Sequence, residues 1–153
     1  MGPTVRVVIM GSGRVGARIA TILAKNGHEV TIIDVDGESF RRLPPTFNGS
    51  TVIGTGIDED ILRSAGIERA DAFIAVSGKD NRNIMATQLV DLLFDVDERI
   101  CRITDPVREE TYRRMGMTTV CPTTTVSAVI IDKVINMDAA IPGRLGAALS
   151  DVF

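Results

Sequence analysis

The chain has 153 residues, of which 44% are hydrophobic and 24% charged, and its formal net charge is −3. This composition is ordinary for a folded domain and argues against a disordered or fibrous chain. Nucleic-acid binding is not expected, because the chain is not basic and only 4% of its residues are aromatic, with no Trp and one Tyr. No apolar run approaches the roughly 18 residues of a membrane-spanning helix.

Strand-like and helical patterns alternate almost to the end of the chain. Runs rich in valine and isoleucine predict six strands, at residues 5–10, 29–34, 50–54, 71–76, 99–104 and 118–122. The segments between and after them predict helices at residues 14–27, 37–43, 58–66, 81–94, 106–116 and 124–135. The strands are continuous apolar runs, which is typical of a parallel sheet covered on both faces. We therefore predict an α/β fold, a doubly wound parallel six-stranded sheet with helices on both faces.

Residues 1–135 are assigned to a single domain. From Asn136 onward the helical periodicity weakens, and Pro142 and Gly143 interrupt the segment. Residues 136–153 are therefore expected to form a linker or a docking tail.

The stretch "GSGRVG" after the first strand fits the pattern G-x-G-x-x-G. It follows a strand and opens a helix, which is the context that makes this pattern specific for a Rossmann-like nucleotide site. Gly11 suits the tight turn, Gly13 allows the backbone to approach a pyrophosphate, and Gly16 allows close packing of helix and sheet. The start of the helix then favours an anion. The candidate phosphate-binding residues are Gly11, Ser12, Gly13, Arg14, Val15 and Gly16.

Asp34 ends the second strand, eighteen positions after Gly16 (34 − 16), where the fingerprint expects an acidic residue. Its carboxylate is suited to accept hydrogen bonds from both hydroxyls of an adenosine ribose, and it disfavours the 2′-phosphate of NADP. The alternative is that Asp34 or Asp36 only caps the next helix. We assign the capping role to Asp36 and the ribose to Asp34.

The sequence contains few candidate catalytic residues. The only histidine, His28, follows the first helix, at the end of the sheet opposite the expected crevice, and is predicted to be structural. Cys101 and Cys121 are expected to be buried thiols in a reducing compartment, and no secretory signal pattern opens the chain. A nucleotide sensor without catalysis is favoured. The alternatives are a fragment of an NAD-dependent oxidoreductase and an interaction module that has lost its ligand.

From residue 5 to residue 135 the chain resembles the N-terminal nucleotide-binding domain of the RCK/KTN family. The resemblance rests on "GSGRVG", "GHEVTIIDVD", "AGIERADAFIAVSGKDNRNI", "CRITDP" and "MGMTTVCP", in the family's order and spacing. Members are cytosolic regulatory subunits of Trk- and Ktr-type potassium uptake systems and gating domains of some potassium channels. A dehydrogenase would share only the first of these motifs.

The resemblance implies roles for several residues. Arg14 matches the family arginine that reaches phosphates of its own or a neighbouring subunit's nucleotide, as a bidentate guanidinium can. Asp34 matches the ribose-binding acid, and Val35 lies beside the adenine. Ser77 and Gly78 match positions that line the nucleotide crevice.

Three further positions match the family pattern. Asp80 and Asn83 match the family's "D-x-x-N" at the start of the next helix, where Asp80 is also expected to cap that helix. Arg102 matches an arginine that faces the ligand or the partner subunit. In the stretch "GTGID", Thr55 stands where the family usually has an aspartate, which puts the fine ligand preference in doubt. Thr55 and Gly56 remain candidate nucleotide-binding residues.

Ligand and partners are constrained only by class. NAD(H), ATP, ADP and AMP all share the adenosine portion. The family implies a membrane-embedded potassium transporter or channel subunit as partner, and a cytoplasmic location at the inner face of the membrane. It also implies a homodimer or larger ring, which the apolar residues of segments 81–94 and 124–135 support. The family's C-terminal ligand-binding domain is missing from this sequence, so we expect either an excised piece or a short subunit with a companion RCK chain.

Overall fold

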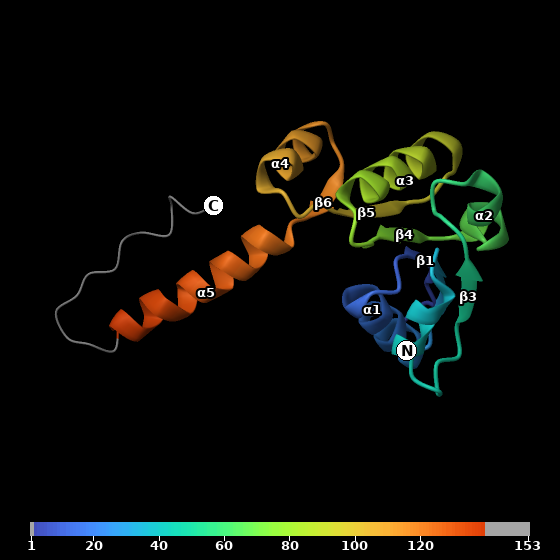
Figure 1. Cartoon of the computed structure of the whole chain (residues 1–153), viewed down its shortest axis with the longest axis horizontal. Helices are drawn as coiled ribbons and strands as arrows, with labels where there is room; N and C mark the ends of the chain where they lie inside the picture. The colour runs from blue at the N-terminus through green and yellow to red at the C-terminus, as the bar shows by residue number, and fades with distance from the viewer. Residues whose placement is uncertain (1, 140–153) are drawn as a thin grey trace.

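The computed structural model describes residues 2–139, in which six parallel strands form one sheet with helices on both sides (Figure 1). The strands are β1 (Arg6–Met10), β2 (Glu29–Asp34), β3 (Ser50–Ile53), β4 (Ala72–Ala75), β5 (Glu98–Arg102) and β6 (Thr118–Val120). The α-helices are α1 (Arg14–Lys25), α2 (Glu59–Ser64), α3 (Asp80–Leu93), α4 (Pro106–Arg114) and α5 (Pro122–Ala139). Two 3₁₀ helices, η1 (Gly37–Arg42) and η2 (Ile67–Arg69), complete the order.

The strands lie in the order β3-β2-β1-β4-β5-β6, and every neighbouring pair is parallel. The chain starts in the middle of the sheet, builds outward through β2 and β3, and then returns to β1 to build the other half. This is the doubly wound arrangement, and its direction changes between β1 and β4. The predicted fold class is confirmed.

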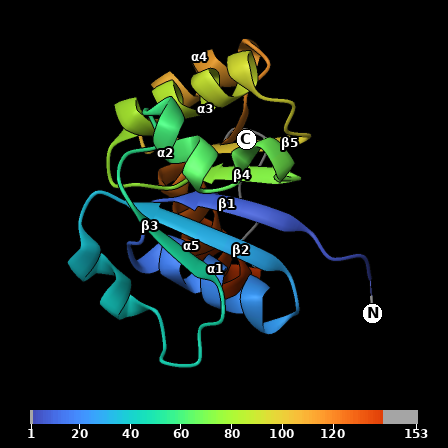
Figure 2. The same cartoon turned by 90° about the vertical axis from the view of Figure 1, so that its right-hand side faces the viewer.

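Successive residues of β1 point into two different apolar layers. Val8 and Met10 belong to the core under α2 and α3, whereas Val7 and Ile9 belong to the core over α1. Figure 2 shows these layers, with α2, α3 and α4 on one side of the sheet and α1 on the other. Because the strand is buried on both faces from residue 7 to residue 10, these four residues are all apolar, without alternation.

Local signals in the sequence set most helix ends. Gly27, with φ +86°, follows α1, and Gly66, with φ +83°, follows α2. Asp36 accepts a hydrogen bond from the N–H of Glu38 at the start of η1, as predicted, and Asp58 caps α2 in the same way. These positions were recognisable because carboxylates and glycines are the preferred residues at such ends.

Helix α5 differs from the prediction. It spans 18 residues and continues to Ala139, beyond the predicted end at residue 135, so it is longer than α3 with its 14 residues. No glycine or proline interrupts the chain between residues 123 and 141, which explains the extension. The helix projects away from the sheet (Figure 1). The rest of the predicted tail, 140–153, lies outside the described residues.

Candidate functional site

The glycine loop packs closely against the end of β4. Gly11 has φ +108°, and a Cβ there would lie 2.7 Å from the backbone nitrogen of Ser77. A Cβ on Gly16 would lie 1.8 Å from the carbonyl oxygen of Gly11. Around Gly13, by contrast, nothing lies within 4 Å of such an atom. Two glycines are therefore required by the fold itself, while Gly13 borders open space.

The start of α1 has no protein cap. Its first turn contains no acidic residue and Gly13 makes no side-chain cap bond, whereas α2, α4 and η1 are each capped by an aspartate. The first backbone N–H bonded within α1 is that of Ala17, to the carbonyl of Gly13 at 2.9 Å. The preceding N–H groups and the helix dipole give this end the chemistry of an anion site.

Asp34 ties the end of β2 to the glycine loop. Its Oδ2 accepts the N–H of Ser12 at 2.7 Å, and its Oδ1 accepts the N–H of Asp36 at 2.9 Å. Each carboxylate oxygen retains capacity for a further hydrogen bond. Asp34 therefore holds the loop in place and remains able to accept hydroxyl groups from a ligand.

A small, partly open cavity of about 30 Å³ lies at the carboxyl ends of β1 to β4. A nucleotide is far larger, so most of one bound here would lie outside this cavity. The predicted residues that the fold brings together around the cavity are Gly11, Asp34, Val35, Thr55, Gly56 and Ser77. Four other lining residues were not predicted from the sequence: Met10, Ile33, Gly54 and Arg82. Arg82 is the most informative of them, because it adds a positive charge to a crevice that already holds the Asp34 carboxylate.

Four other predicted residues do not line this cavity. Ser12 is buried in the glycine loop, while Gly78 is exposed beyond β4. Val15 is 46% exposed in the first turn of α1. Arg14 is exposed and lines a different groove, on the outer side of α1.

Asn83 organises the end of β4. It is fully buried, and its Oδ1 accepts the N–H of Ser77 at 2.9 Å and the hydroxyl of Ser77 at 2.7 Å. Its Nδ2 donates to the carbonyl oxygens of Ser77 at 2.9 Å and of Arg102 at 3.0 Å. One amide thereby fixes the loop after β4 to the end of β5.

The expectation that Asp80 caps its own helix is wrong. The residue before α3, Lys79, makes no side-chain cap bond, and Oδ2 of Asp80 instead accepts the N–H groups of Thr104 at 2.9 Å and Asp105 at 3.3 Å. These groups belong to the loop after β5, so Asp80 joins two loops at the same edge of the sheet.

Arg102 carries a buried polar atom that the protein does not satisfy. Its side-chain Nε is buried and has no hydrogen-bond partner within residues 2–139. A buried donor without a partner is unfavourable, by about 1–3 kcal/mol. Arg102 lies at the carboxyl end of β5, as expected, but it does not line the enclosed cavity.

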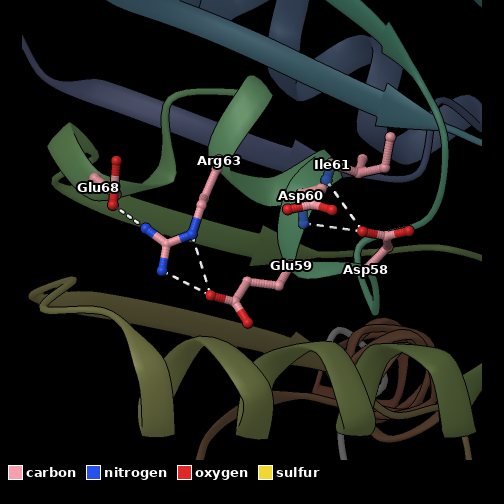
Figure 3. Close-up of polar contacts among 6 residues, drawn as sticks. All are labelled: Asp58, Glu59, Asp60, Ile61, Arg63 and Glu68. Atoms are coloured by element: carbon pink, nitrogen blue, oxygen red, sulfur yellow. Dashed lines mark hydrogen bonds and ion pairs between the residues drawn. The ribbon is translucent and has the colours of Figure 1, made fainter.

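Figure 3 shows the start of α2, which follows the loop that carries Thr55 and Gly56. The N–H of Asp58 donates to the carbonyl of Thr55 at 3.1 Å. Oδ1 of Asp58 accepts the N–H groups of Asp60 at 2.9 Å and Ile61 at 3.3 Å. Farther along, Arg63 pairs with Glu59 and Glu68, and its guanidinium lies 5.1 Å from the ring centre of Phe94. The hydrogen bonds that Arg63 donates to Glu59 raise the pKa of Arg63. This group is structural and lies outside the cavity wall.

The remaining titratable candidates lie away from the crevice. Nδ1 of His28 accepts the N–H of Val5 at 3.2 Å, so the predicted structural role is confirmed. Cys101 and Cys121 are both buried free thiols, as predicted. Among residues 2–139, no group of three or more His, Cys, Asp or Glu side chains is placed to hold a metal ion. No helix in that part of the chain has the length and apolar character to cross a membrane.

Fold and site together define a Rossmann-like NAD(P)-binding fold with the switch-point crevice of that class. Residues 7–123 match the TrkA-N domain, and the chain belongs to the TrkA-N family. The family resemblance found in the sequence is confirmed.

The curated relatives are Trk system proteins. The chain is 51% identical over 114 residues to a Trk system potassium uptake protein TrkA from Streptomyces coelicolor, covering 74% of this chain and 51% of the relative. It is 36% identical over 109 residues to a Trk system potassium uptake protein TrkA homolog from Pyrococcus abyssi, covering 71% of this chain and 48% of the relative. The chain thus spans about half the length of these relatives.

Solved structures share the fold at lower identity. The GsuK RCK domain matches with a TM-score of 0.71 and 23% identity, over 91% of this chain and 30% of that one. Structures of GsuK bound to NAD and to ADP each match with a TM-score of 0.66 and 19% identity, over 82% of this chain. The match covers 23% of the NAD-bound chain and 33% of the ADP-bound chain. The AMP-bound Kef C-terminal domain of Shewanella denitrificans matches with a TM-score of 0.69 and 17% identity, over 91% of this chain and 82% of that one.

Proposed function

We propose that this chain is a regulatory domain that binds an adenine nucleotide and controls a potassium transporter or channel, without catalysis. The observation that carries the proposal is the start of α1, which has no protein cap, borders open space at Gly13, and lies beside the Asp34 carboxylate. A phosphate and a ribose are the two groups that such a pair of features recognises. The family and its Trk relatives supply the regulatory role.

The residues around the crevice fit an adenine nucleotide. The N–H groups at the start of α1 would hold phosphate, and Asp34 would accept the ribose hydroxyls. Val35, which is 53% exposed, offers an apolar surface for the adenine. Arg82, which also lines the cavity, would supply a cation for the ligand's negative charge. The buried Nε of Arg102 is a donor suited to the ligand or to a partner subunit.

The proposed ligand is NAD(H), ATP, ADP or AMP. Structures with this fold have been solved with NAD, ADP and AMP, which supports an adenosine ligand as a class. Asp34 disfavours NADP, because a 2′-phosphate would meet its carboxylate at close range. Thr55 presents a hydroxyl where the family usually has a carboxylate, so the preference among these ligands is proposed to differ from that of other members.

A regulatory role is favoured over an oxidoreductase fragment. Among the described residues that line the crevice cavity there is no histidine, lysine, tyrosine or cysteine to exchange a proton with a substrate. The single histidine of the chain packs against the start of β1 instead.

The proposed partner is the membrane-embedded subunit of a potassium transporter or channel, which would hold this domain at the cytoplasmic face of the membrane. We propose that the chain acts as a homodimer or larger ring, with a companion RCK chain as a further partner. Nucleotide would act by binding one arrangement of the subunits more tightly than another, since a ligand with equal affinity for both shifts nothing.

A pair of glycine variants tests the nucleotide site. Gly13→Ala is expected to fold normally, because its φ of −75° suits alanine and no atom lies within 4 Å, but to lose nucleotide affinity at least tenfold. Calorimetric titration with NADH, ATP, ADP and AMP measures the affinities, and mass spectrometry of nucleotide released from gently purified protein identifies the resident one.

Gly16→Ala is the contrasting variant. Its Cβ would overlap the Gly11 carbonyl, so it is expected to lower stability whether or not nucleotide binds. If Gly13→Ala binds all four nucleotides as tightly as wild type, the proposed phosphate site is wrong.

A further inference from the structure

A cationic surface lies on the outer side of α1. It is a groove of about 500 Å³ between α1 and the end of η1, which lie next to one another below the sheet in Figure 2. Three arginines line it, Arg14, Arg18 and Arg42, together with the apolar side chains of Ala17, Ile22 and Pro44. Among the residues that the structure describes, no carboxylate lines its wall. We call it the arginine groove.

The three guanidinium groups have no acidic partner in the described part of the chain. Within residues 2–136, whose side chains the structure describes, none of Arg14, Arg18 and Arg42 forms an ion pair or a side-chain hydrogen bond. The neighbouring Arg41, by contrast, pairs with Glu38 at 2.8 Å. Helix α1 contains no acidic residue at all. Three like charges around one groove repel one another, and an anion placed between them removes that repulsion.

The positions of the arginines suit more than one phosphate group. Arg14 and Arg18 are four residues apart on α1, so their Cβ atoms lie about 5–6 Å apart on the same helix face. Arg42 approaches from a different element, beyond β2. Each guanidinium group can bind two phosphate oxygens at once through parallel N–H groups.

We propose that the arginine groove binds the phosphate groups of an oligophosphate or of a phospholipid headgroup. A cytoplasmic loop of a membrane protein is a poor occupant, because such loops carry an excess of lysine and arginine. This site is separate from the Asp34 crevice and does not require that adenosine binds there.

The test uses sodium tripolyphosphate as the probe, titrated calorimetrically into the whole chain. The double variant Arg18→Gln/Arg42→Gln is expected to weaken its binding at least tenfold. The control Arg113→Gln/Arg114→Gln removes the same charge from exposed ion pairs on α4 and is expected to change nothing. Gly13→Ala, which alters the anion site at the start of α1, is expected to keep the tripolyphosphate binding that Arg18→Gln/Arg42→Gln loses while AMP binding falls, which separates this site from the nucleotide site.

A second arm distinguishes the source of the phosphate. Co-sedimentation with phosphatidylcholine vesicles, with and without phosphatidylglycerol, measures headgroup binding. Binding only to the anionic vesicles, lost in Arg18→Gln/Arg42→Gln, identifies a lipid headgroup; tripolyphosphate binding without it identifies a soluble ligand. The proposal is overturned if neither probe binds, if the α4 control loses as much affinity, or if poly-glutamate binds as tightly as tripolyphosphate.

Discussion

The carboxylate of Asp34 accepts the backbone N–H of Ser12 at 2.7 Å, across 22 residues of sequence. This bond joins the end of β2 to the glycine loop that opens α1. Any ligand that occupies the loop is therefore next to the carboxylate, and the two halves of the proposed nucleotide site depend on each other.

Replacing Asp34 with alanine is the first prediction. It is expected to weaken adenine-nucleotide binding by about 1.5–3 kcal/mol, the range for hydrogen bonds to a charged group. Asp36→Ala is the matched control, because Asp36 lies two residues away and only caps η1. It is expected to cost about 0.5–2 kcal/mol of stability and to leave affinity unchanged. Equal affinity of Asp34→Ala and wild type in calorimetric titration would remove Asp34 from the site.

How much of this arrangement the sequence predicts depends on how far apart along the chain the interacting residues lie. The glycine spacing, the caps at Asp36 and Asp58 and the apolar strands are local patterns, so the fold and the glycine loop were predictable. The bonds from Asp80 to Thr104 and Asp105 join groups 24 and 25 residues apart, and no local pattern marks them.

Arg82 illustrates the same limit in the crevice. It lies in the first turn of α3, where the sequence looks like an ordinary helix start, and only the packing of α3 beside β4 brings it to the cavity. The predicted strand ends indicate which edge of the sheet carries the cavity. They do not indicate which helical residue reaches that edge.

Asn83 provides the second prediction. Asn83→Ala leaves the N–H and carbonyl of Ser77 and the carbonyl of Arg102 without their partner, and it is expected to lower the free energy of unfolding by about 2–4 kcal/mol. Asn81→Ala, an exposed position on the same helix with one bond to Arg108, is expected to change it by less than about 0.5 kcal/mol. Urea unfolding measures both. A loss no larger than that of Asn81→Ala would show that the network contributes little.

The third prediction concerns pH. Burial raises the pKa of the Cys101 thiol to about 11, from an ordinary value near 9. The unfolded thiol therefore ionises first, so this group's contribution to stability is complete below pH 9 and is lost as the pH rises toward 11. The slope is up to about 1.4 kcal/mol per pH unit.

The variant Cys101→Ala isolates this contribution. Unfolding under reducing conditions between pH 8 and pH 11 is expected to show a steeper loss of stability in wild type than in the variant. Parallel curves for the two proteins would mean that the buried thiol does not resist ionisation.

The fourth prediction is that the chain has no oxidoreductase activity. Incubated with NADH or NAD⁺ and a panel of small carbonyl compounds and hydroxy acids, the chain is expected to show no change in NADH absorbance. The reason is that no histidine, lysine, tyrosine or cysteine is among the described residues that line the crevice cavity, and that its one carboxylate, Asp34, already accepts the N–H groups of Ser12 and Asp36. Steady turnover that disappears in Gly13→Ala would favour the oxidoreductase alternative.

The fifth prediction is that α5 forms a dimer contact. Val126, Val129, Ile130 and Val134 are 52–58% exposed, and their spacing places them along one stripe of a helix that projects from the sheet (Figure 1). Burying such a side chain fully contributes about 1.5–3 kcal/mol, so the stripe is a strong drive for association. Light scattering at high micromolar concentration is expected to give at least a dimeric mass.

Two variants locate that contact on the helix. Val129→Glu/Ile130→Glu places charges within the stripe and is expected to give a monomer with unchanged circular dichroism. Asp132→Lys changes a charge on a different side of the same helix and is expected to keep the dimer, because it leaves the stripe intact. A monomeric wild type would reject the dimer. A dimer that survives Val129→Glu/Ile130→Glu would move the contact elsewhere, with the exposed Met85 and Leu92 of α3 as the next surface to change.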